Sequence, residues 1–538
     1  MAWIRHGGEV HELAAGKTIF DFADELAVRV PSSCGRQGSC HECVVEVKAG
    51  ARALEPPTAP ESFLRSPFRL ACQARVADAS EDIEFTLLER HPKILTATRG
   101  AAPAGIDPPV VRRGDKVWYE DEPLDDYRGR MLGIAMDFGT TTVVFELIDL
   151  ETGQGLYLDT FENPQRFGGS DIMHRISYDG GAHRGELHQA AVNALNGEIR
   201  EMCGRLGVDR NQIYEVVVAG NSTMRDLFFG LDVQSIGQRP YQSRTEREYL
   251  DGRRTTTALV EPAHRLGVLA HPKARVYGPP LVASHVGADI TAGLAAIDIE
   301  SQHDPILFVD IGTNTEVVAG HAGRLVAASC PAGPAFEGGG IRCGMAGVEG
   351  AIESLEWTAG GWRFRTIGDG PPRGVCGSGL IDLLAHLRRH GRMTEKGVFQ
   401  DRAREIPIVP EHGLAISRED VSNLAQAKAA NYCGQNIVLR SLGVSPGRIA
   451  RLYLAGGFAN YVDVRNAIEI GFLAPVPEER IVKAGNASLE GARRLLLSRS
   501  RRVSIETTLR RIEHVELELE PDFFEIFVEG CQFKPMPG

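Results

Sequence analysis

The chain has 538 residues, of which 43% are hydrophobic and 24% are charged, and its formal net charge is −12. These values are typical of globular proteins and argue against a disordered chain, and the length predicts about three or four domains. The acidic balance argues against nucleic acid or an anionic membrane as a partner. The first residues contain no apolar signal core, and no apolar run reaches the ~18 residues of a membrane span, so we expect a cytoplasmic protein.

Residues 1–90 are predicted to form a small β-rich domain. Short runs on either side of Gly7-Gly8 predict a hairpin, and Thr18 is predicted to cap a helix that begins at Ile19. The predicted strands are residues 3–5, 9–13, 44–47 and 83–88. These elements fit a small electron-transfer domain.

Four of the ten cysteines lie within this first domain. They follow the pattern C-x5-C-x2-C, then 28 residues, then C, and they are Cys34, Cys40, Cys43 and Cys72. The first gap is one residue longer than in the plant-type iron–sulfur pattern, C-x4-C-x2-C…C. Zinc would favour two paired arms of the form C-x2–4-C, and only one arm here has that form. We therefore predict these cysteines as ligands of an iron–sulfur cluster, with a zinc knuckle as the alternative.

The segment around the last of these cysteines carries a resemblance. Residues 69–73, Arg-Leu-Ala-Cys-Gln, resemble the segment around the last ligand of 2Fe–2S ferredoxins. The resemblance implies an α+β domain with the β-grasp fold and a 2Fe–2S cluster as its cofactor. The other six cysteines are scattered singly and are expected to pack in the core, so we predict no second cluster.

Residues 91–130 differ in character from the flanking sequence. They contain five prolines and many charges and show no sustained apolar periodicity. This composition predicts a linker or a small accessory module.

Two elements recur in the same order after residue 131. An apolar run leads into the turn D-F-G-T-T-T at residues 137–142, and a second run leads into D-I-G-T-N-T at residues 310–315. Later in each half, residues 216–221 and 452–457 are an apolar strand that ends in Ala-Gly. One D-x-G-T turn alone would be a weak signal because Asp-Gly turns are common. Two elements in the same order predict an internal duplication.

The chemistry of these turns suits phosphate. Glycine and threonine let backbone N–H groups and hydroxyls approach phosphate oxygens closely. An aspartate at the end of a strand can hold Mg²⁺ through water, because Mg²⁺ keeps much of its hydration. Two such turns that face each other could grip the phosphate tail of a nucleotide from both sides. Neither a G-x4-G-K-[ST] loop nor a G-x-G-x-x-G motif is present in the sequence.

The duplicated pattern resembles the actin/Hsp70/sugar-kinase superfamily of ATPases, over residues 131–497. The resemblance implies a two-lobed α/β actin-like fold with duplicated RNase H-like domains, here residues 131–300 and 301–538. It also implies ATP and Mg²⁺ as cofactors, with Asp137 and Asp310 as catalytic residues. The implied nucleotide-binding residues are those of the two turns, of an adenosine-side glycine turn and of the start of a hinge helix: Gly139, Thr140, Thr141, Gly312, Thr313, Asn314, Gly456, Gly457, Phe458, Gly377 and Ser378.

The order of the predicted domains resembles the reductive activators of corrinoid proteins. That resemblance implies an ATP-dependent protein that passes one electron from its 2Fe–2S cluster to the Co(II) corrinoid of a partner methyltransferase protein, which regenerates Co(I). It further implies a low-potential electron donor, such as a ferredoxin, a flavodoxin or a reductase, and a homodimer. The sequence has no D-x-H-x-x-G motif, so the corrinoid should belong to the partner. The lone Cys531 departs from the methylamine-pathway branch, whose C-terminus carries cysteine-rich four-iron clusters.

Three other classes of protein are alternatives to this interpretation. One is a small-molecule kinase with a ferredoxin-like redox domain, and a second is an electron-carrying binding module whose ATPase fold is inert. Both turns retain their Asp, Gly and Thr, which weighs against inertness. The third is an activator of radical dehydratases, which usually shares a four-iron cluster between subunits, and the four N-terminal cysteines do not suggest that arrangement.

Overall fold

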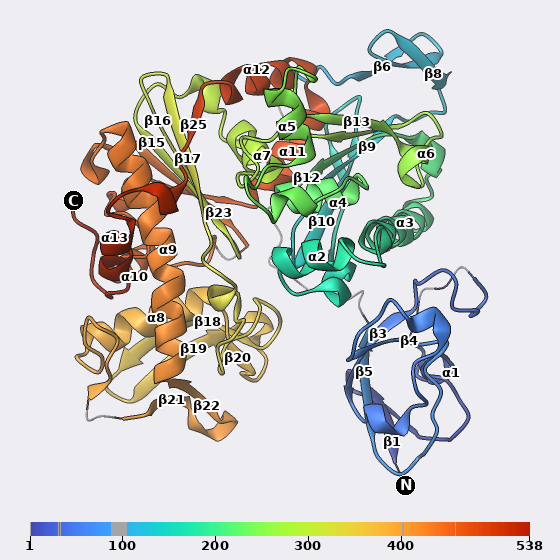
Figure 1. The fold of residues 1–538 in the computed structure, drawn as a ribbon, viewed down its shortest axis with the longest axis horizontal. Helices are drawn as coiled ribbons and strands as arrows, with labels where there is room; N and C mark the ends of the chain where they lie inside the picture. The colour runs from blue at the N-terminus through green and yellow to red at the C-terminus, as the bar shows by residue number, and fades with distance from the viewer. Residues whose placement is uncertain are drawn as a thin grey trace. The chain divides into compact units, whose positions relative to one another are not determined.

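The computed structural model describes residues 2–28, 30, 32, 34–87, 105–400, 403–457 and 459–538. The chain divides into two compact units, Met1–Pro92 with Pro109–Gly278, and Lys93–Pro108 with Pro279–Gly538 (Figure 1). Residues 279–300, predicted as the end of the first lobe, therefore belong to the second unit. Among the described residues, none of the helices combines the length and the apolarity that crossing a bilayer requires.

The N-terminal domain is a five-stranded mixed sheet with one helix. The strand order is β2-β1-β5-β3-β4, in which β1 and β5 are parallel and the other pairs are antiparallel. Thr18 and Asp21 cap the helix reciprocally, since each side chain accepts the other's backbone N–H, at 2.8 and 3.2 Å. The elements are β1 (Trp3–His6), β2 (Glu9–Glu12), α1 (Ile19–Glu25), β3 (Val44–Ala49), β4 (Phe68–Leu70) and β5 (Ile83–Leu87).

The predicted linker range is partly folded. Three short antiparallel strands form a sheet of their own: β6 (Val110–Arg113), β7 (Lys116–Tyr119) and β8 (Glu122–Asp126). The buried side chains of Val110, Val117 and Leu124 give this sheet one apolar face. Residues 88–104, the start of the range included, lie outside the described residues.

The first lobe is built on a six-stranded sheet with the order β11-β10-β9-β12-β14-β13. Every residue of β12 is buried, as expected for a central parallel strand covered on both faces. Its strands are β9 (Leu132–Phe138), β10 (Thr142–Asp149), β11 (Gly155–Glu162), β12 (Ile213–Ala219), β13 (Leu259–Pro262) and β14 (Arg275–Gly278). Its helices are η3 (Pro164–Gly168), α2 (Ile172–Asp179), α3 (Glu186–Leu206), α4 (Ser222–Phe228), α5 (Arg244–Leu250) and α6 (Ala263–Leu266).

The second unit contains another six-stranded sheet, with the order β24-β23-β15-β16-β17-β25. Its strands are β15 (Ile306–Ile311), β16 (Thr315–His321), β17 (Arg324–Cys330), β23 (Arg451–Gly456), β24 (Ile481–Gly485) and β25 (Ile512–His514). Two smaller sheets comprise β18 (Ala351–Thr358), β19 (Gly361–Thr366) and β20 (Gly374–Val375), and β21 (Glu405–Val409) and β22 (Leu414–Ser417).

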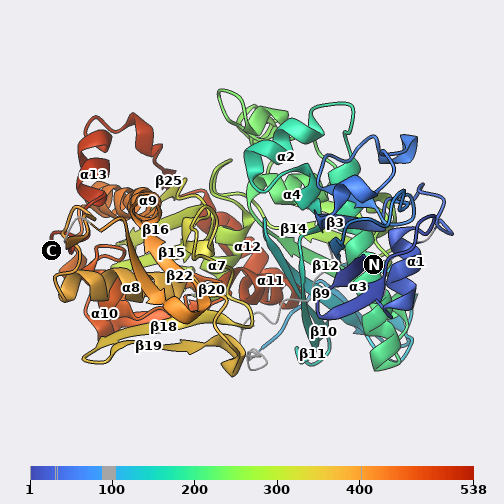
Figure 2. The same ribbon diagram turned by 90° about the horizontal axis from the view of Figure 1, so that it is seen from below.

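The helices of the second unit pack on these sheets and on one another. The helix α8 lies against β18 (Figure 2), and α7 packs closely on α11, where a Cβ on Gly491 would lie 1.8 Å from the carbonyl oxygen of Ala292. The helices are α7 (Ala288–Ala296), α8 (Gly377–Arg389), α9 (Arg418–Leu442), α10 (Val464–Glu469), α11 (Ala487–Leu497), α12 (Arg499–Leu509), α13 (Phe523–Gly530) and the short η7 (Ala335–Glu337).

The two large sheets repeat one another in register as well as in order. In the first, antiparallel β10 and parallel β12 flank β9, and Asp137 pairs with Ala219. In the second, antiparallel β16 and parallel β23 flank β15, and Asp310 pairs with Ala455. The predicted duplication and the predicted fold class, a β-grasp ferredoxin domain followed by an actin-like region, are confirmed.

Candidate functional site

The four N-terminal cysteines approach one another as two pairs. The Sγ atom of Cys43 donates a hydrogen bond to that of Cys72 over 3.3 Å, and both side chains are buried. Cys34 and Cys40 are joined by a second thiol hydrogen bond, and both are partly exposed. Within the described part of the chain, no three His, Cys, Asp or Glu side chains are arranged to hold a single metal ion. Two pairs of thiols instead fit a cluster of two irons.

The surroundings of two of these thiols, Cys34 and Cys72, favour the thiolate form that metal ligation requires. Burial acts to raise the pKa of Cys34, but hydrogen bonds from Cys40 and from the backbone of the loop lower it to about 6. The hydrogen bond from Cys43 lowers the pKa of Cys72 to about 6 as well, while it raises that of Cys43. The two pairs also repel each other's negative charge, so Cys34 raises the pKa of Cys72 and Cys40 raises that of Cys43.

The loop that carries Cys34 and Cys40 is fixed by a glycine and an arginine. Gly38 has φ of +80°, and a Cβ there would lie 2.9 Å from Cβ of Pro60. The Arg36 guanidinium pairs with Asp24 and lies over the ring of Phe20, 4.0 Å from its centroid. These contacts hold the loop on the helix α1.

The first predicted phosphate turn, Gly139 to Thr141, joins β9 to β10. Asn163 donates from Nδ2 to the carbonyl oxygen of Gly139 over 2.8 Å. The Arg175 guanidinium donates to the carbonyl oxygen of Thr140 over 2.7 Å, and burial lowers the pKa of Arg175 to about 9. These bonds hold the carbonyl side of the turn against the lobe, which leaves the N–H side as the side suited to phosphate.

Asn221 completes the support of this turn. It follows β12 and donates from Nδ2 to Oγ1 of Thr140 over 3.1 Å. The register of β9 and β12 explains the contact, since it places residue 137 beside residue 219. Sequence reasoning did not assign Asn163, Arg175 or Asn221 to the site. Asn221 could have been found from its position after an Ala-Gly strand end, whereas Arg175 lies 35 residues from Thr140 with no local signal.

The second predicted turn lies at the equivalent place in the second unit. The Gly312 N–H donates to the carbonyl oxygen of Asn314 over 3.2 Å, and the Thr313 hydroxyl donates to Oε2 of Glu337 over 2.9 Å. Gly456 lies against this turn: its φ is +112°, and a Cβ there would lie 2.1 Å from the carbonyl oxygen of Ile311. A Cβ on Gly457 would meet no heavy atom within 4 Å.

Asp310 pairs in register with a second acidic residue, Glu316 of β16. The buried Glu316 has a pKa raised well above its ordinary value, first by burial and then by the charges of Asp289 and Asp310. Carboxylate oxygens are the ligands that Mg²⁺ prefers, but among the described residues these groups form no set of three that could hold a metal ion directly, and the raised pKa of Glu316 favours its neutral form. The sequence interpretation assigned neither Glu316 nor Glu337 to the site, although a glutamate inside an otherwise apolar strand is a visible signal.

Two other predicted nucleotide-binding residues, Gly377 and Ser378, lie at the start of α8. The Ser378 hydroxyl donates to the carbonyl oxygen of Glu353 over 2.7 Å, so it binds the start of α8 to β18. Gly377 opens this helix, and the next glycine, Gly379, approaches β18 so closely that a Cβ would lie 2.4 Å from the carbonyl oxygen of Ile352. Phe458 lies outside the described residues.

Three protein-family models match consecutive parts of the chain. The 2Fe-2S iron-sulfur cluster binding domain matches residues 5–77, the RACo middle region matches residues 132–302, and the C-terminal domain of RACo, the ASKHA domain, matches residues 304–536. The fold and these matches define an iron–sulfur protein with an actin-like ASKHA region. With both RACo domains behind a 2Fe–2S domain, the chain belongs to the RACo family.

Individual relatives extend over much or all of the chain. The corrinoid activation enzyme RamQ of Eubacterium limosum is 28% identical over 96% of both chains. The [Co(II) methylated amine-specific corrinoid protein] reductase of Methanosarcina barkeri is 27% identical over 69% of this chain and 71% of its own. A solved structure of a reductive activator for corrinoid, iron-sulfur protein superposes with a TM-score of 0.71 at 28% identity and 99% coverage of both chains.

Proposed function

We propose that this chain is an ATP-dependent reductive activator of corrinoid proteins. It passes one electron from a 2Fe–2S cluster to the Co(II) corrinoid of a partner methyltransferase protein and thereby regenerates Co(I). One observation carries the proposal: a single chain combines two pairs of convergent thiols with two sheets of equal register, each of which ends in a D-x-G-T turn. The corrinoid activation enzyme and the reductive activator to which the chain is similar support the same assignment.

The cysteines would hold the cluster as the pairs in which they lie. Cys34 and Cys40 would bind one iron and Cys43 and Cys72 the other, and the cluster, when bound, supplies one-electron transfer. The electron would come from an external low-potential donor, such as a ferredoxin, a flavodoxin or a reductase. For one electron, each 59 mV by which the acceptor's potential lies below that of the donor costs about 1.4 kcal/mol. ATP would supply this free energy.

The two turns would hold the nucleotide. The N–H groups and hydroxyls of Gly139, Thr140 and Thr141 in the first turn, and those of Gly312, Thr313 and Asn314 in the second, would bind phosphate oxygens. Asp137 and Asp310 would orient the hydrated Mg²⁺, and Gly456, Gly457 and Phe458 would lie on the adenosine side. Differential binding of ATP to two states of the chain would supply the free energy for the gated transfer.

The remaining roles follow the predicted domain division. Residues 1–90 would carry the cluster and 91–130 would connect it. The lobes, predicted as 131–300 and 301–538 but with residues 279–300 in the second unit of the structure, would bind ATP and the corrinoid protein. The start of α8, with Gly377 and Ser378, would transmit lobe movement through its packing on β18. We propose a cytoplasmic homodimer whose partners are proteins and small molecules, with neither nucleic acid nor a membrane among them.

The deciding experiment is an anaerobic assay of the full chain. A rhombic electron paramagnetic resonance signal of the reduced protein, together with ATP hydrolysis stimulated by a Co(II) corrinoid protein, is the expected result. Stimulation by a sugar in place of the corrinoid protein would overturn the proposal in favour of a small-molecule kinase.

Two variants separate the halves of the proposal. Cys40→Ser should abolish corrinoid reduction and leave nucleotide binding near normal, because Cys40 lies outside the lobes. Asp310→Ala should weaken Mg-ATP hydrolysis and leave the visible spectrum of the cluster intact. Retained reduction in the first variant, or an unchanged hydrolysis rate in the second, would remove that residue from its assigned role.

A further inference from the structure

The cluster-bearing domain and the first lobe share an interface within the first unit. The Arg166 guanidinium pairs with Glu46 of β3 over 2.7 Å, and both side chains are largely buried. Beside the cluster loop, His41 pairs with Glu186 of α3 over 2.9 Å, and Asn193 of α3 donates to the carbonyl oxygen of Cys40 over 3.3 Å. The backbone of Cys40, one of the predicted cluster ligands, is thus hydrogen-bonded to the first lobe.

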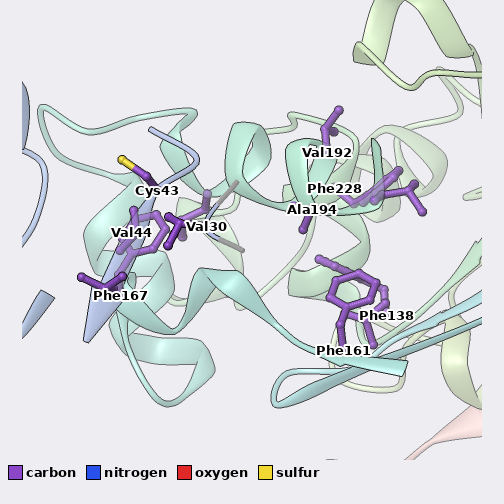
Figure 3. Packing of buried hydrophobic residues seen from close by; sticks show 14 of the residues in the cluster. Val30, Cys43, Val44, Phe138, Phe161, Phe167, Val192, Ala194 and Phe228 are labelled. Atoms are coloured by element: carbon purple, nitrogen blue, oxygen red, sulfur yellow. The ribbon is translucent and has the colours of Figure 1, made fainter. Parts of the chain in front are cut away.

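Aromatic rings fill the centre of this interface. The ring of His41 stacks on Phe63 with centroids 4.0 Å apart, and Phe63 meets the edge of Phe167 at 5.8 Å. Phe167 in turn meets Tyr178 at 5.6 Å, and the Tyr178 hydroxyl donates to the carbonyl oxygen of Phe63. Val44 and Phe167, both shown in Figure 3, belong to the same buried cluster. Packed aromatic rings flanked by ion pairs are typical of a specific interface.

The elements that form this interface are the ones that hold the first phosphate turn. Asn163, which binds both ends of the turn through its side chain and its N–H group, caps η3, and η3 carries Arg166 and Phe167. Arg175, which binds Thr140, lies one helical turn before Tyr178 in α2. Asn163 and Arg175, which hold the turn, therefore each lie within four residues of a residue of the interface.

We propose that binding of phosphate at residues 139–141 strengthens docking of the cluster-bearing domain on the face made by η3, α2 and α3. A phosphate on the N–H side of the turn polarises its peptide groups, so the bonds from Asn163 and Arg175 to the carbonyl side become stronger. Those bonds order η3 and α2, and with them Arg166, Phe167 and Tyr178. This inference rests on the proposed nucleotide site and adds to it a coupling between ATP and the position of the cluster.

Hydrogen–deuterium exchange of the anaerobic, cluster-loaded full chain tests the coupling, with Mg-AMPPNP as the probe. We expect the probe to slow exchange of residues 139–142 and, by about fivefold, that of residues 40–46 and 61–68, which is the lower end of typical coupling between sites. Protection of 139–142 with unchanged or faster exchange at 40–46 and 61–68 would overturn the coupling alone. Absence of any Mg-AMPPNP binding by calorimetry would refute the nucleotide site and the coupling together.

Variants on both sides of one contact supply an independent measurement. Arg166→Ala and Glu46→Gln should each speed exchange of residues 61–68 about tenfold, the factor that corresponds to 1.4 kcal/mol. Because coupling between two sites is reciprocal, each of these two variants should also raise the Kd of Mg-AMPPNP. The rise should not exceed the factor by which Mg-AMPPNP slows exchange at residues 40–46 and 61–68. The matched control is Arg5→Ala, which removes the exposed pair with Asp82 elsewhere on the same domain. An unchanged Kd in variants that undock, or an equal rise in the control, would overturn the inference.

Discussion

The cluster loop offers a comparison of two glycines that differ in one physical respect. Gly35 and Gly38 both have positive φ, at +63° and +80°. A Cβ on Gly35 would meet no heavy atom within 4 Å, whereas a Cβ on Gly38 would lie 2.9 Å from Cβ of Pro60 and 3.2 Å from the amide of Gln73. Gly35→Ala therefore adds backbone strain alone, and Gly38→Ala adds the same strain together with a steric clash.

The magnitudes separate the two variants clearly. An alanine in the left-handed region costs about 1–2 kcal/mol, a penalty that both variants share. Overpacking against fixed neighbours adds about 1–3 kcal/mol, and it applies to Gly38→Ala alone. Pro60 cannot move freely because it lies in η2 (Ala59–Glu61), whose capping box joins Thr58 to Glu61. We expect Gly38→Ala to be the less stable variant by about 1–3 kcal/mol.

The assay is urea-induced loss of the visible absorption of the cluster, measured anaerobically on the full chain. Gly35→Ala should shift the midpoint modestly to lower urea, and Gly38→Ala should shift it further or fail to retain the cluster. Equal midpoints for the two variants would show that the loop relaxes around residue 38, and the steric argument would then be wrong.

Three further predictions concern the lobes. Gly456→Ala should unfold or strongly destabilise the second unit, because its Cβ would lie 2.1 Å from the carbonyl oxygen of Ile311, whereas Gly457→Ala should leave the midpoint of circular dichroism melting nearly unchanged. Arg175→Met should weaken Mg-AMPPNP binding by at least about tenfold in calorimetry, since the carbonyl oxygen of Thr140 loses a charged donor; unchanged affinity would contradict this. Burial raises the pKa of Asp382 from its ordinary 3.8 to about 6, so the native state holds the extra proton and stability should fall as pH rises from about 4 to about 6. Asp382→Asn should flatten urea midpoints over that range, and an unaltered pH profile would show that the carboxyl does not titrate as described.

The sequence was sufficient for features whose chemistry is local in the chain. Three of the four predicted cluster ligands, Cys34, Cys40 and Cys43, and the residues of each D-x-G-T turn lie within a few positions of one another, because a tight turn needs its glycine and its polar side chain beside the strand end; their functional roles stay predictions. The duplication could also be predicted, since equal registers in two sheets follow from equal strand ends.

Other features depend on contacts between distant segments. Arg175 reaches Thr140 from a helix that no turn motif announces, and Glu337 reaches Thr313 from a short helix outside the duplicated pattern. The small sheet at residues 110–126 agrees with the accessory module that was one of the two alternatives for this range. Its individual strands were not predicted, because they are short and rich in charge and Val110, Val117 and Leu124 provide the apolar face. The interface around Phe63 and Phe167 likewise could not be predicted, because it depends on contacts between two domains that are far apart in the sequence.

The antiparallel strands β10 and β16 each lead from a predicted phosphate turn to a second turn at the opposite end of the strand. β10 starts at the turn of residues 139–141 and ends at Asp149, so the turn at 151–153 lies a full strand length away from it. The exposed turn at Ala322-Gly323 stands in the same relation to residues 312–314. Fluorophores, affinity tags or surface tethers attached at these two turns would report on each lobe, or immobilise it, without touching the chemistry at the opposite end of each strand.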